Sequence, residues 1–305
     1  MGIEYAKEKY DSAINTIEIG KNKKVGGQTA MPFLFEEGAT PYAPLVALEI
    51  LDCEPVDWPE HVKRPINGVI KDPVRWARAC VKDFGAKILC VRLYGAHPEY
   101  GNRSAEEEVA LLKSILKSAG VPLIIVGCGD EAKDNDVLPK VSQALKGENC
   151  MFGIATQNNY KTLTATALAD GHSIIAESPI DINIAKQVNI LISDMGFDPK
   201  RIVMHPTTTS LGYGMEYVYS IMERARLAAF IGDAMLAMPF ILFVGQEVWK
   251  TKEAREAGEE QGANWEVATA VSMLQAGADI LVMRHPHAAG TVKRYIDMLM
   301  SGGKK

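Results

Sequence analysis

Short, continuously apolar runs recur along this chain and alternate with helix-like segments. Each run is apolar throughout instead of alternating apolar with polar residues, which is typical of parallel strands that are covered on both faces. Eight runs have this character, at residues 46–50, 88–93, 123–126, 151–154, 174–176, 202–204, 240–244 and 280–283. The sequence therefore indicates an α/β protein built on a buried parallel sheet.

Helix signals separate these runs and define the architecture. Ser104 and Glu107 form a capping box before an apolar stripe. Three junctions, FGAKILCV, AGVPLIIV and AGADILVM, repeat the order of helix end, glycine and strand. Together they predict a (β/α)8 TIM barrel over residues 46–305. Residues 1–45 would form an N-terminal extension or cap, in which residues 25–35 form a hairpin that closes one end of the barrel. A doubly wound open sheet is the alternative, but no GxGxxG follows any run.

Composition narrows the classes of function. The chain has 305 residues, a net charge of −5 and no basic stretch interleaved with aromatic residues, so nucleic acid is not an expected partner. The longest apolar run, residues 234–245, is too short to span a bilayer, and the charged N-terminus lacks the apolar segment of a signal peptide. We therefore expect a cytoplasmic protein without a membrane partner. The five cysteines include no CxxC pair, so no iron–sulfur cluster is expected in this chain.

Polar residues and glycines gather directly after several runs, where the loops of a barrel share one face. The richest loop lies in RIVMHPTTTSLGYGMEYVYSIMER, residues 201–224, and contains Thr207 and the tripeptide Gly212, Tyr213, Gly214. Glycines beside a tyrosine let the backbone approach a flat ligand or a partner surface, although a tight strand-to-helix turn explains the same residues without a ligand. Further candidate binding residues come from other loops: Gln157, Asn158, Asp181 and Asn183.

Several polar residues also have purely structural interpretations. Asn158 and Asp181 are expected to cap the helices that follow them. Asp130 begins the charged stretch DEAKDND, which is expected to be a solvated loop, and His172 lies at a helix-to-strand junction where a structural role is expected. Three charged residues of the helix that begins near Met215 are expected on its solvated face: Glu223, Arg224 and Arg226.

No arranged set of catalytic residues is readable. His285 and His287 could both bind a metal, but no third ligand stands at a recognisable spacing, so no metal site is predicted. Pro286 between them is expected to open the last helix. Neither these histidines nor His205 has a motif-level serine, cysteine or aspartate partner, so no catalytic residue is assigned.

Longer stretches, in one consistent order from about residue 58 to residue 300, point to one family. They are VPLIIVGCGDEAKDNDVL, GENCMFGIATQNNYKTLTA, DINIAKQVNILISDMG, HPTTTSLGYGMEYVYSIMERARLAA, VGQEVWKTKEA and LQAGADILVMRHPHA. Together they resemble the small, or delta, subunit of the corrinoid/iron–sulfur protein of the reductive acetyl-CoA pathway, part of the acetyl-CoA decarbonylase/synthase complex.

The resemblance implies a TIM barrel that pairs with a large subunit carrying a [4Fe–4S] cluster and a mobile corrinoid domain. The corrinoid (cobalamin), shared with that subunit, carries a methyl group from methyltetrahydrofolate, through a methyltransferase, to acetyl-CoA synthase. The small subunit would help to hold and shield the corrinoid without a cobalt or cluster ligand of its own. The residues expected to contact the corrinoid are then Gly212, Tyr213, Gly214, Thr207, Gln157, Asn158, Asp181 and Asn183.

The chain departs from the family pattern at the rim, because His205 and Tyr94 stand where acidic residues are usual. A paralogue that serves another corrinoid protein is therefore one alternative. A second is a pterin-binding TIM-barrel methyltransferase acting on methyltetrahydrofolate, and a third is a scaffold whose rim only docks partners. The pterin would be held by paired amide and carboxylate side chains, from Asn158, Asp181 and Asn183.

Overall fold

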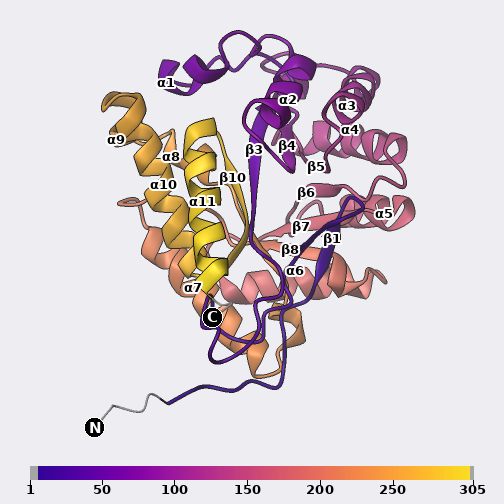
Figure 1. Ribbon diagram of the computed structural model, residues 1–305. Coiled ribbons are helices and arrows are strands. Elements are labelled where there is room, and N and C mark those ends of the chain that lie inside the picture. Colours follow the sequence, from indigo (N-terminus) through magenta and orange to yellow (C-terminus); the bar gives the residue numbers. More distant parts are fainter. Residues whose placement is uncertain (1–5, 303–305) are drawn as a thin grey trace.

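The computed structural model describes residues 6–302, and within them eight parallel strands close into a barrel (Figure 1). In order around the barrel the strands are β3 (Leu45–Leu51), β4 (Leu89–Arg92), β5 (Leu123–Val126), β6 (Met151–Ala155), β7 (Ser173–Glu177), β8 (Ile202–His205), β9 (Phe240–Leu242) and β10 (Ala278–Met283). The last strand, β10, pairs in parallel with β3 and closes the ring. The predicted (β/α)8 barrel is confirmed. The division at residues 1–45 and 46–305 stays a prediction, and residues 1–5 and 303–305 lie outside the described residues.

Helices surround the barrel (Figure 1). The longer ones are α2 (Pro73–Lys82), α3 (Ala105–Ala119), α4 (Glu131–Ala144), α5 (Tyr160–Asp170), α6 (Ile182–Asp194), α7 (Met215–Phe230), α10 (Glu259–Gln275) and α11 (Pro286–Gly302). Shorter helices and 3-10 turns are α1 (Glu60–Lys63), α8 (Val244–Val248), α9 (Lys252–Glu256), η1 (Arg64–Ile66), η2 (Tyr94–Ala96), η3 (Pro199–Arg201) and η4 (Ala234–Leu236). None of the helices that the structure describes is both long and apolar enough to cross a membrane.

Helix starts depend on single polar residues, and most of the predicted ones are confirmed. Ser104 and Glu107 form the predicted capping box of α3, and Asp181 caps α6 by accepting from backbone N–H groups. The prediction for Asn158 is wrong, because α5 begins at Tyr160 and Asn158 lies one residue before the cap position. The prediction for Asp130 is also wrong: its side chain accepts a hydrogen bond from the Lys133 N–H and caps α4, so the charged stretch is helical.

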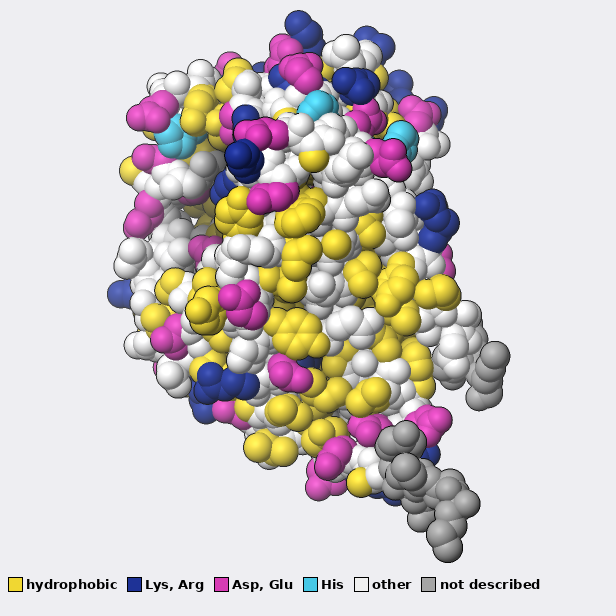
Figure 2. Space-filling view, turned by 90° about the vertical axis from the view of Figure 1, so that its left-hand side faces the viewer, with side chains coloured by type: hydrophobic (Ala, Val, Ile, Leu, Met, Phe, Trp, Pro, Cys, Tyr) yellow, Lys and Arg dark blue, Asp and Glu magenta, His cyan; other side chains and the backbone are white. Residues whose placement is uncertain are grey.

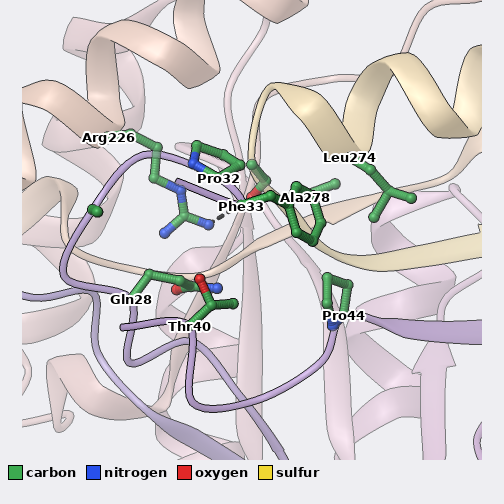
Figure 3. Close-up of a pocket in the computed structure, with 10 residues that line it drawn as sticks. Gln28, Pro32, Phe33, Thr40, Pro44, Arg226, Leu274 and Ala278 are labelled. Atoms are coloured by element: carbon green, nitrogen blue, oxygen red, sulfur yellow. Dashed lines mark hydrogen bonds between the residues drawn. The ribbon is translucent and has the colours of Figure 1, made fainter. Parts of the chain in front are cut away.

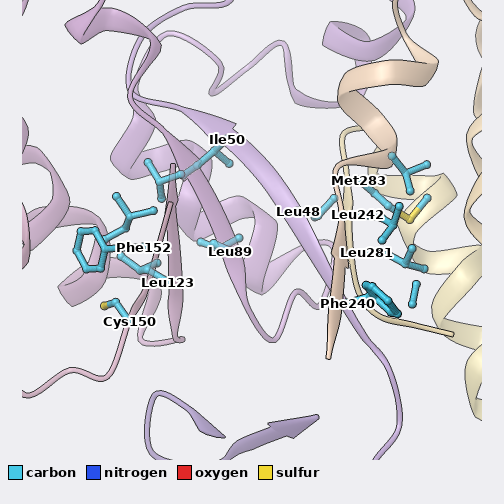
Figure 4. Close-up of a cluster of buried hydrophobic side chains, with 14 of the residues drawn as sticks. Leu48, Ile50, Leu89, Leu123, Cys150, Phe152, Phe240, Leu242, Leu281 and Met283 are labelled. Carbon is cyan, nitrogen blue, oxygen red and sulfur yellow. The ribbon is translucent and has the colours of Figure 1, made fainter. Parts of the chain in front are cut away.

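Strand side chains alternate between two buried cores. One set fills the inside of the barrel: Ala47, Ile88, Cys90, Ile124, Val126, Met151, Ile175, Val203, Ile241, Phe243, Ile280 and Val282. The other set lies between the strands and the surrounding helices, and Figure 4 shows part of it: Leu48, Ile50, Leu89, Leu123, Cys150, Phe152, Phe240, Leu242, Leu281 and Met283. Because both faces of the sheet are covered, the strands appear in the sequence as unbroken apolar runs.

A short hairpin closes the end of the barrel at which the strands begin. Strands β1 (Ile17–Ile19) and β2 (Lys23–Val25) pair antiparallel, and their buried side chains Ile17, Ile19 and Val25 belong to the inner core. The turn uses Gly20 at φ +63°, where a Cβ atom would lie 2.4 Å from Pro122. The predicted hairpin therefore exists but is misplaced, because it occupies residues 17–25 and not residues 25–35.

Arg226 is buried, so the prediction that it lies on the solvated face of α7 is wrong. Its guanidinium donates to the Gly277 carbonyl at 2.6 Å and pairs with Asp279, which also accepts from the Gln28 side chain at 2.7 Å and from the Phe240 N–H at 2.8 Å. Glu223 and Arg224 are exposed as predicted. The buried cluster ties the segment before β3 to α7 and β10.

A small cavity of about 20 Å³ lies beside this cluster (Figure 3). A cavity of this size holds about one water molecule and is too small for a cofactor. It is lined by Gln28, Ala30, Pro32, Phe33, Thr40, Pro44, Arg226, Leu274, Gly277 and Ala278. Its position near the start of β10 and before the start of β3 places it at the end of the barrel opposite the loops expected to carry function.

Candidate functional site

A cavity of about 200 Å³ opens at the C-terminal ends of the strands, the end at which TIM barrels place their sites. We call it the mouth cavity. Its lining follows or ends β3, β4, β5, β9 and β10 and consists of Leu51, Asp57, Trp58, Pro59, Arg92, Tyr94, Cys128, Gln246, Trp249, Lys250, Arg255 and Arg284.

Two arginines share one carboxylate next to this cavity. Glu49 of β3 is buried and pairs with Arg92 at 2.8 Å and with Arg284. Burial opposes ionisation of Glu49, but Arg284 and Arg92 together outweigh it and lower the pKa of this carboxyl to about 2. The Arg284 guanidinium also lies over the Trp58 ring, 4.6 Å from its centroid. Arg92 donates to the Gln246 side chain at 2.5 Å. With two guanidiniums and one carboxylate, this cluster carries a net positive charge.

Two other side chains at the mouth, Cys128 and Tyr94, are kept uncharged by burial. Burial raises the pKa of the Cys128 thiol to about 12, so the thiolate, which is the nucleophilic form, does not accumulate at neutral pH. Burial also raises the pKa of the Tyr94 hydroxyl, and the Tyr94 ring stacks on Tyr100 with 4.2 Å between centroids. The mouth cavity therefore offers ring faces and hydrogen-bond donors, and we assign no nucleophile–base pair to it.

The residues predicted from the glycine-rich loop lie on another part of the same rim, after β8. Gly212 and Gly214 adopt φ of +79° and +89°, and Tyr213 between them is 50% exposed. The Tyr213 hydroxyl donates to Glu253 at 2.8 Å, which connects this loop to α9. Thr207, at φ +68°, donates from its hydroxyl to the Ser178 carbonyl at 2.8 Å. These contacts fix the loop geometry, and none of the four predicted residues lines the mouth cavity as the structure describes it.

The remaining predicted residues come from the loops after β6 and β7. Gln157 and Asn158 are exposed, and the Gln157 amide donates to Gln187 of α6 at 3.0 Å. Asp181 uses one carboxylate oxygen to accept the N–H groups of Asn183 at 2.7 Å and Ile184 at 3.1 Å. The structure thus places the predicted residues along one arc of the rim, after β6, β7 and β8.

His205 ends β8 inside a chain of polar contacts. Its Nδ1 lies 3.0 Å from a Glu177 oxygen and its Nε2 lies 3.1 Å from the Thr208 hydroxyl, which accepts from the Phe243 N–H at 2.9 Å. The family resemblance leads us to expect an acidic residue at the position of His205. Here the neighbouring strand β7 supplies a carboxylate beside that position, from Glu177.

Some buried hydroxyl groups in these loops have no hydrogen-bond partner among the described residues: those of Ser178, Thr209 and Ser210. Buried polar groups are paired in most native structures, so these hydroxyls leave unused hydrogen-bonding capacity in the loops after β7 and β8. This is the second feature of the rim, beside the mouth cavity, that points to a bound group.

The sequence analysis missed the mouth arginines and a third group beside the two C-terminal histidines. Glu49 interrupts the apolar strand β3 and Arg92 ends the apolar strand β4, and a charge in such a run is the signal by which they could have been found. Glu259 lies next to His285 and His287, although the rest of α10 and β10 separate it from them in the sequence. The structural role predicted for His172 is confirmed: its ring is buried, lies 3.0 Å from the Ser142 carbonyl and accepts from the Cys150 N–H at 3.1 Å.

Solved structures with this architecture include dihydropteroate synthases. That of Burkholderia cenocepacia superposes with a TM-score of 0.59 at 13% identity, covering 96% of this chain and 98% of that one. That of Thermus thermophilus gives a TM-score of 0.58 at 13% identity, covering 89% and 99%. At this identity the likeness establishes the TIM-barrel fold alone.

The sequence defines the family more closely. Residues 16–293 match the family described as CO dehydrogenase/acetyl-CoA synthase delta subunit. Subunit delta of the acetyl-CoA decarbonylase/synthase complex of Methanocaldococcus jannaschii is 32% identical over 94% of this chain and 74% of its own length. The corresponding subunit of Methanopyrus kandleri is 33% identical over 91% and 70%. The chain belongs to the CO dehydrogenase/acetyl-CoA synthase delta subunit family, which confirms the resemblance.

Proposed function

We propose that this chain is the small subunit of a heterodimeric corrinoid/iron–sulfur methyl carrier and that its barrel mouth covers the corrinoid. The large subunit would hold the [4Fe–4S] cluster and the mobile corrinoid domain. The carrier would take a methyl group from methyltetrahydrofolate through a methyltransferase and present it to acetyl-CoA synthase, in the cytoplasm. Membership in the delta-subunit family is the observation that carries this proposal.

The size and polarity of the mouth support a covering role. The mouth cavity has about 200 Å³, below the roughly 300–1,000 Å³ of pockets that enclose a drug-sized ligand. A broad ring would therefore lie across the mouth, against the rim, and not inside the barrel. The bound corrinoid would supply the cobalt chemistry. A ring fringed with amide groups suits the exposed Gln157 and Asn158 amides. It also suits the hydroxyls of Ser178, Thr209 and Ser210, which have no hydrogen-bond partner in residues 6–302.

The outer surface supports docking of a large partner. Exposed apolar side chains follow α7 from the rim outward: Tyr213 at 50%, Tyr217 at 64%, Leu227 at 39% and Ile231 at 81% exposure. Figure 2 shows hydrophobic side chains gathering on the side of the molecule that carries α7 and α10. Contiguous apolar surface is typical of protein interfaces. A partner bound along α7 would reach the rim at Tyr213 and so lie next to the mouth.

The test compares two glycines in matched conformations within the complex. Gly212 on the rim and Gly171 at the opposite end of the barrel have φ of +79° and +82°, and neither has a neighbour within 4 Å of an added Cβ. In complexes co-expressed with the large subunit, Gly212→Trp is expected to lower the corrinoid retained per complex by about tenfold or more, or about 1.4 kcal/mol. Gly171→Trp is expected to retain corrinoid as the wild type does, because it carries the same backbone strain far from the mouth.

Two results would replace this proposal with an alternative. Full corrinoid retention by the Gly212→Trp complex, with both subunits present, would favour a scaffold that only docks partners. Stoichiometric binding of methyltetrahydrofolate to this chain alone, lost in Asn158→Ala, would favour the pterin-binding methyltransferase. Isothermal titration of the isolated chain with methyltetrahydrofolate separates the two.

A further inference from the structure

Three potential metal ligands meet where α10 and α11 begin. Glu259 is the first residue of α10, His285 follows β10, and His287 is the second residue of α11. One ligand atom from each lies within 4.8 Å of the other two. A groove of about 390 Å³ between the two helices leads to them, and it is lined by Glu259, Glu260, Ala263, Asn264, Val267, His285, His287, Ala288 and Thr291.

His285 is the residue of this cluster that lacks an explanation without a ligand. The residue is 1% exposed, yet its Nε2 atom has no hydrogen-bond partner among the described residues. Oε1 of Glu259 is 3.6 Å from Nε2, which is too far for a hydrogen bond. The Ala288 N–H donates to the other ring nitrogen, Nδ1, at 3.5 Å, the outer limit of a hydrogen bond, so a metal bound at Nε2 would displace only this weak contact. Burying a polar group without a hydrogen-bond partner destabilises the folded state.

We propose that Glu259, His285 and His287 bind a zinc ion, with water in the fourth position. Two histidines and one glutamate with an open position are a ligand set that Zn²⁺ takes in proteins. His287 is exposed and Glu259 is partly exposed, so the ion can enter from the groove. One Glu259 oxygen, Oε2, pairs with Arg64 at 2.9 Å, and the other faces His285 and is free to bind the ion.

The ion would join the starts of α10 and α11 directly behind the mouth cavity. Arg284, the residue before His285, lines that cavity, and so does Trp249, whose ring stacks on His285 with 5.9 Å between centroids. Zinc bound to His285 would therefore fix the ring that supports one wall of the mouth. The site is independent of the corrinoid assignment, because it lies outside the cavity and uses none of the rim residues proposed to contact the corrinoid.

The full chain, freed of metal with a chelator, is titrated with Zn²⁺ by calorimetry and with Co²⁺ by visible absorption. One ion per chain is expected, with Co²⁺ bands of a four-coordinate site. His287→Ala and Glu259→Gln are each expected to weaken Zn²⁺ binding by about tenfold or more, while the matched control His61→Ala binds like the wild type. Arg64→Ala is expected to tighten Zn²⁺ binding, because it removes a positive charge that pairs with the other oxygen of Glu259.

The melting temperature provides a second test of Zn²⁺ binding. Zinc is expected to raise the melting temperature of the wild type and of His61→Ala but not that of His287→Ala, since a ligand that binds only the folded state stabilises it. The proposal is overturned if the wild type binds no stoichiometric Zn²⁺. It is equally overturned if folded His287→Ala and Glu259→Gln, checked by circular dichroism, bind Zn²⁺ as tightly as the wild type does.

Discussion

At the scale of single residues, the charges inside the barrel depend on one another. Glu49 is the carboxylate that both Arg92 and Arg284 contact, and it is fully buried. Removing one partner of a buried ion pair leaves uncompensated charge and destabilises a protein by about 3–5 kcal/mol. We expect Glu49→Gln to lower the free energy of unfolding by that amount, measured by urea denaturation. Glu223→Gln, the same change at an exposed position of α7, serves as the control and is expected to change it by less than about 0.5 kcal/mol.

A second residue-scale prediction concerns a buried pair of carboxyls beneath the rim. Asp52 and Glu108 are both buried, and burial, then the neighbouring Asp52 carboxylate, raise the pKa of Glu108 to about 9. A group whose pKa is raised on folding stabilises the protein below its unfolded pKa, near 4.3, and that stabilisation is lost as the pH rises toward 9. Between these two pKa values, Glu108 is therefore expected to lower the unfolding free energy of the wild type by about 1.4 kcal/mol for each unit that the pH rises.

Glu108→Gln tests this pH dependence. The amide cannot ionise, so the slope of unfolding free energy against pH between about pH 6 and about pH 8 should become flatter by that amount. Urea denaturation at several pH values measures the slope. Equal slopes in the wild type and the variant would show that Glu108 is already ionised at neutral pH in the folded protein.

At the scale of elements, the β1–β2 hairpin is expected to act as part of the barrel core. Ile19 is completely buried among the inner side chains of the barrel. Ile19→Ala removes buried methyl groups and leaves a cavity, which is destabilising by about 2–5 kcal/mol. Ile231→Ala, at a position 81% exposed, is the matched control and is expected to change stability little. If both substitutions have equal small effects on urea denaturation, the hairpin contributes nothing to the stability of the barrel.

Elements defined by local sequence could be predicted, and those defined by distant contacts could not. The strands were readable because both of their faces are buried, and α3 was readable because its capping box lies within four residues. The hairpin was misplaced because its three-residue strands, IEI and KKV, carry charged residues and give no apolar run. Arg226 was assigned to solvent because its partners Gln28 and Asp279 are far away in the sequence.

The candidate site divides in the same way. Loop composition predicted the rim arc after β6, β7 and β8, because glycines and amides there stand out locally. The mouth cavity was missed because its arginines end apolar strands, where their charge is paired with Glu49 from another strand. The metal ligands were missed because Glu259 and His285 are far apart in the sequence. They meet only because the chain runs away along α10 and returns along β10 to the place where α10 begins.

At the scale of the whole molecule, the buried Arg226 cluster joins the N-terminal segment to the closing strand of the barrel. Asp279 at the start of β10 accepts from Arg226 of α7, from Gln28 and from the Phe240 N–H of β9. The Arg226 guanidinium also lies over the Phe240 ring at 5.0 Å. These contacts connect four separate parts of the chain, so we expect the segment before β3 and the barrel to unfold together.

A double-mutant cycle tests that expectation. Asp279→Leu leaves the Arg226 guanidinium buried without its carboxylate, and Arg226→Met leaves the Asp279 carboxylate buried without its guanidinium. Each single variant is expected to lower the free energy of unfolding by about 3–5 kcal/mol. The double variant removes both charges, so its loss should be clearly smaller than the sum of the two single losses. Hydrogen exchange would then show residues around Gln28 exchanging with the barrel strands in the single variants. Additive losses, or exchange of the N-terminal segment alone, would show that the segment is attached to the barrel independently of this pair.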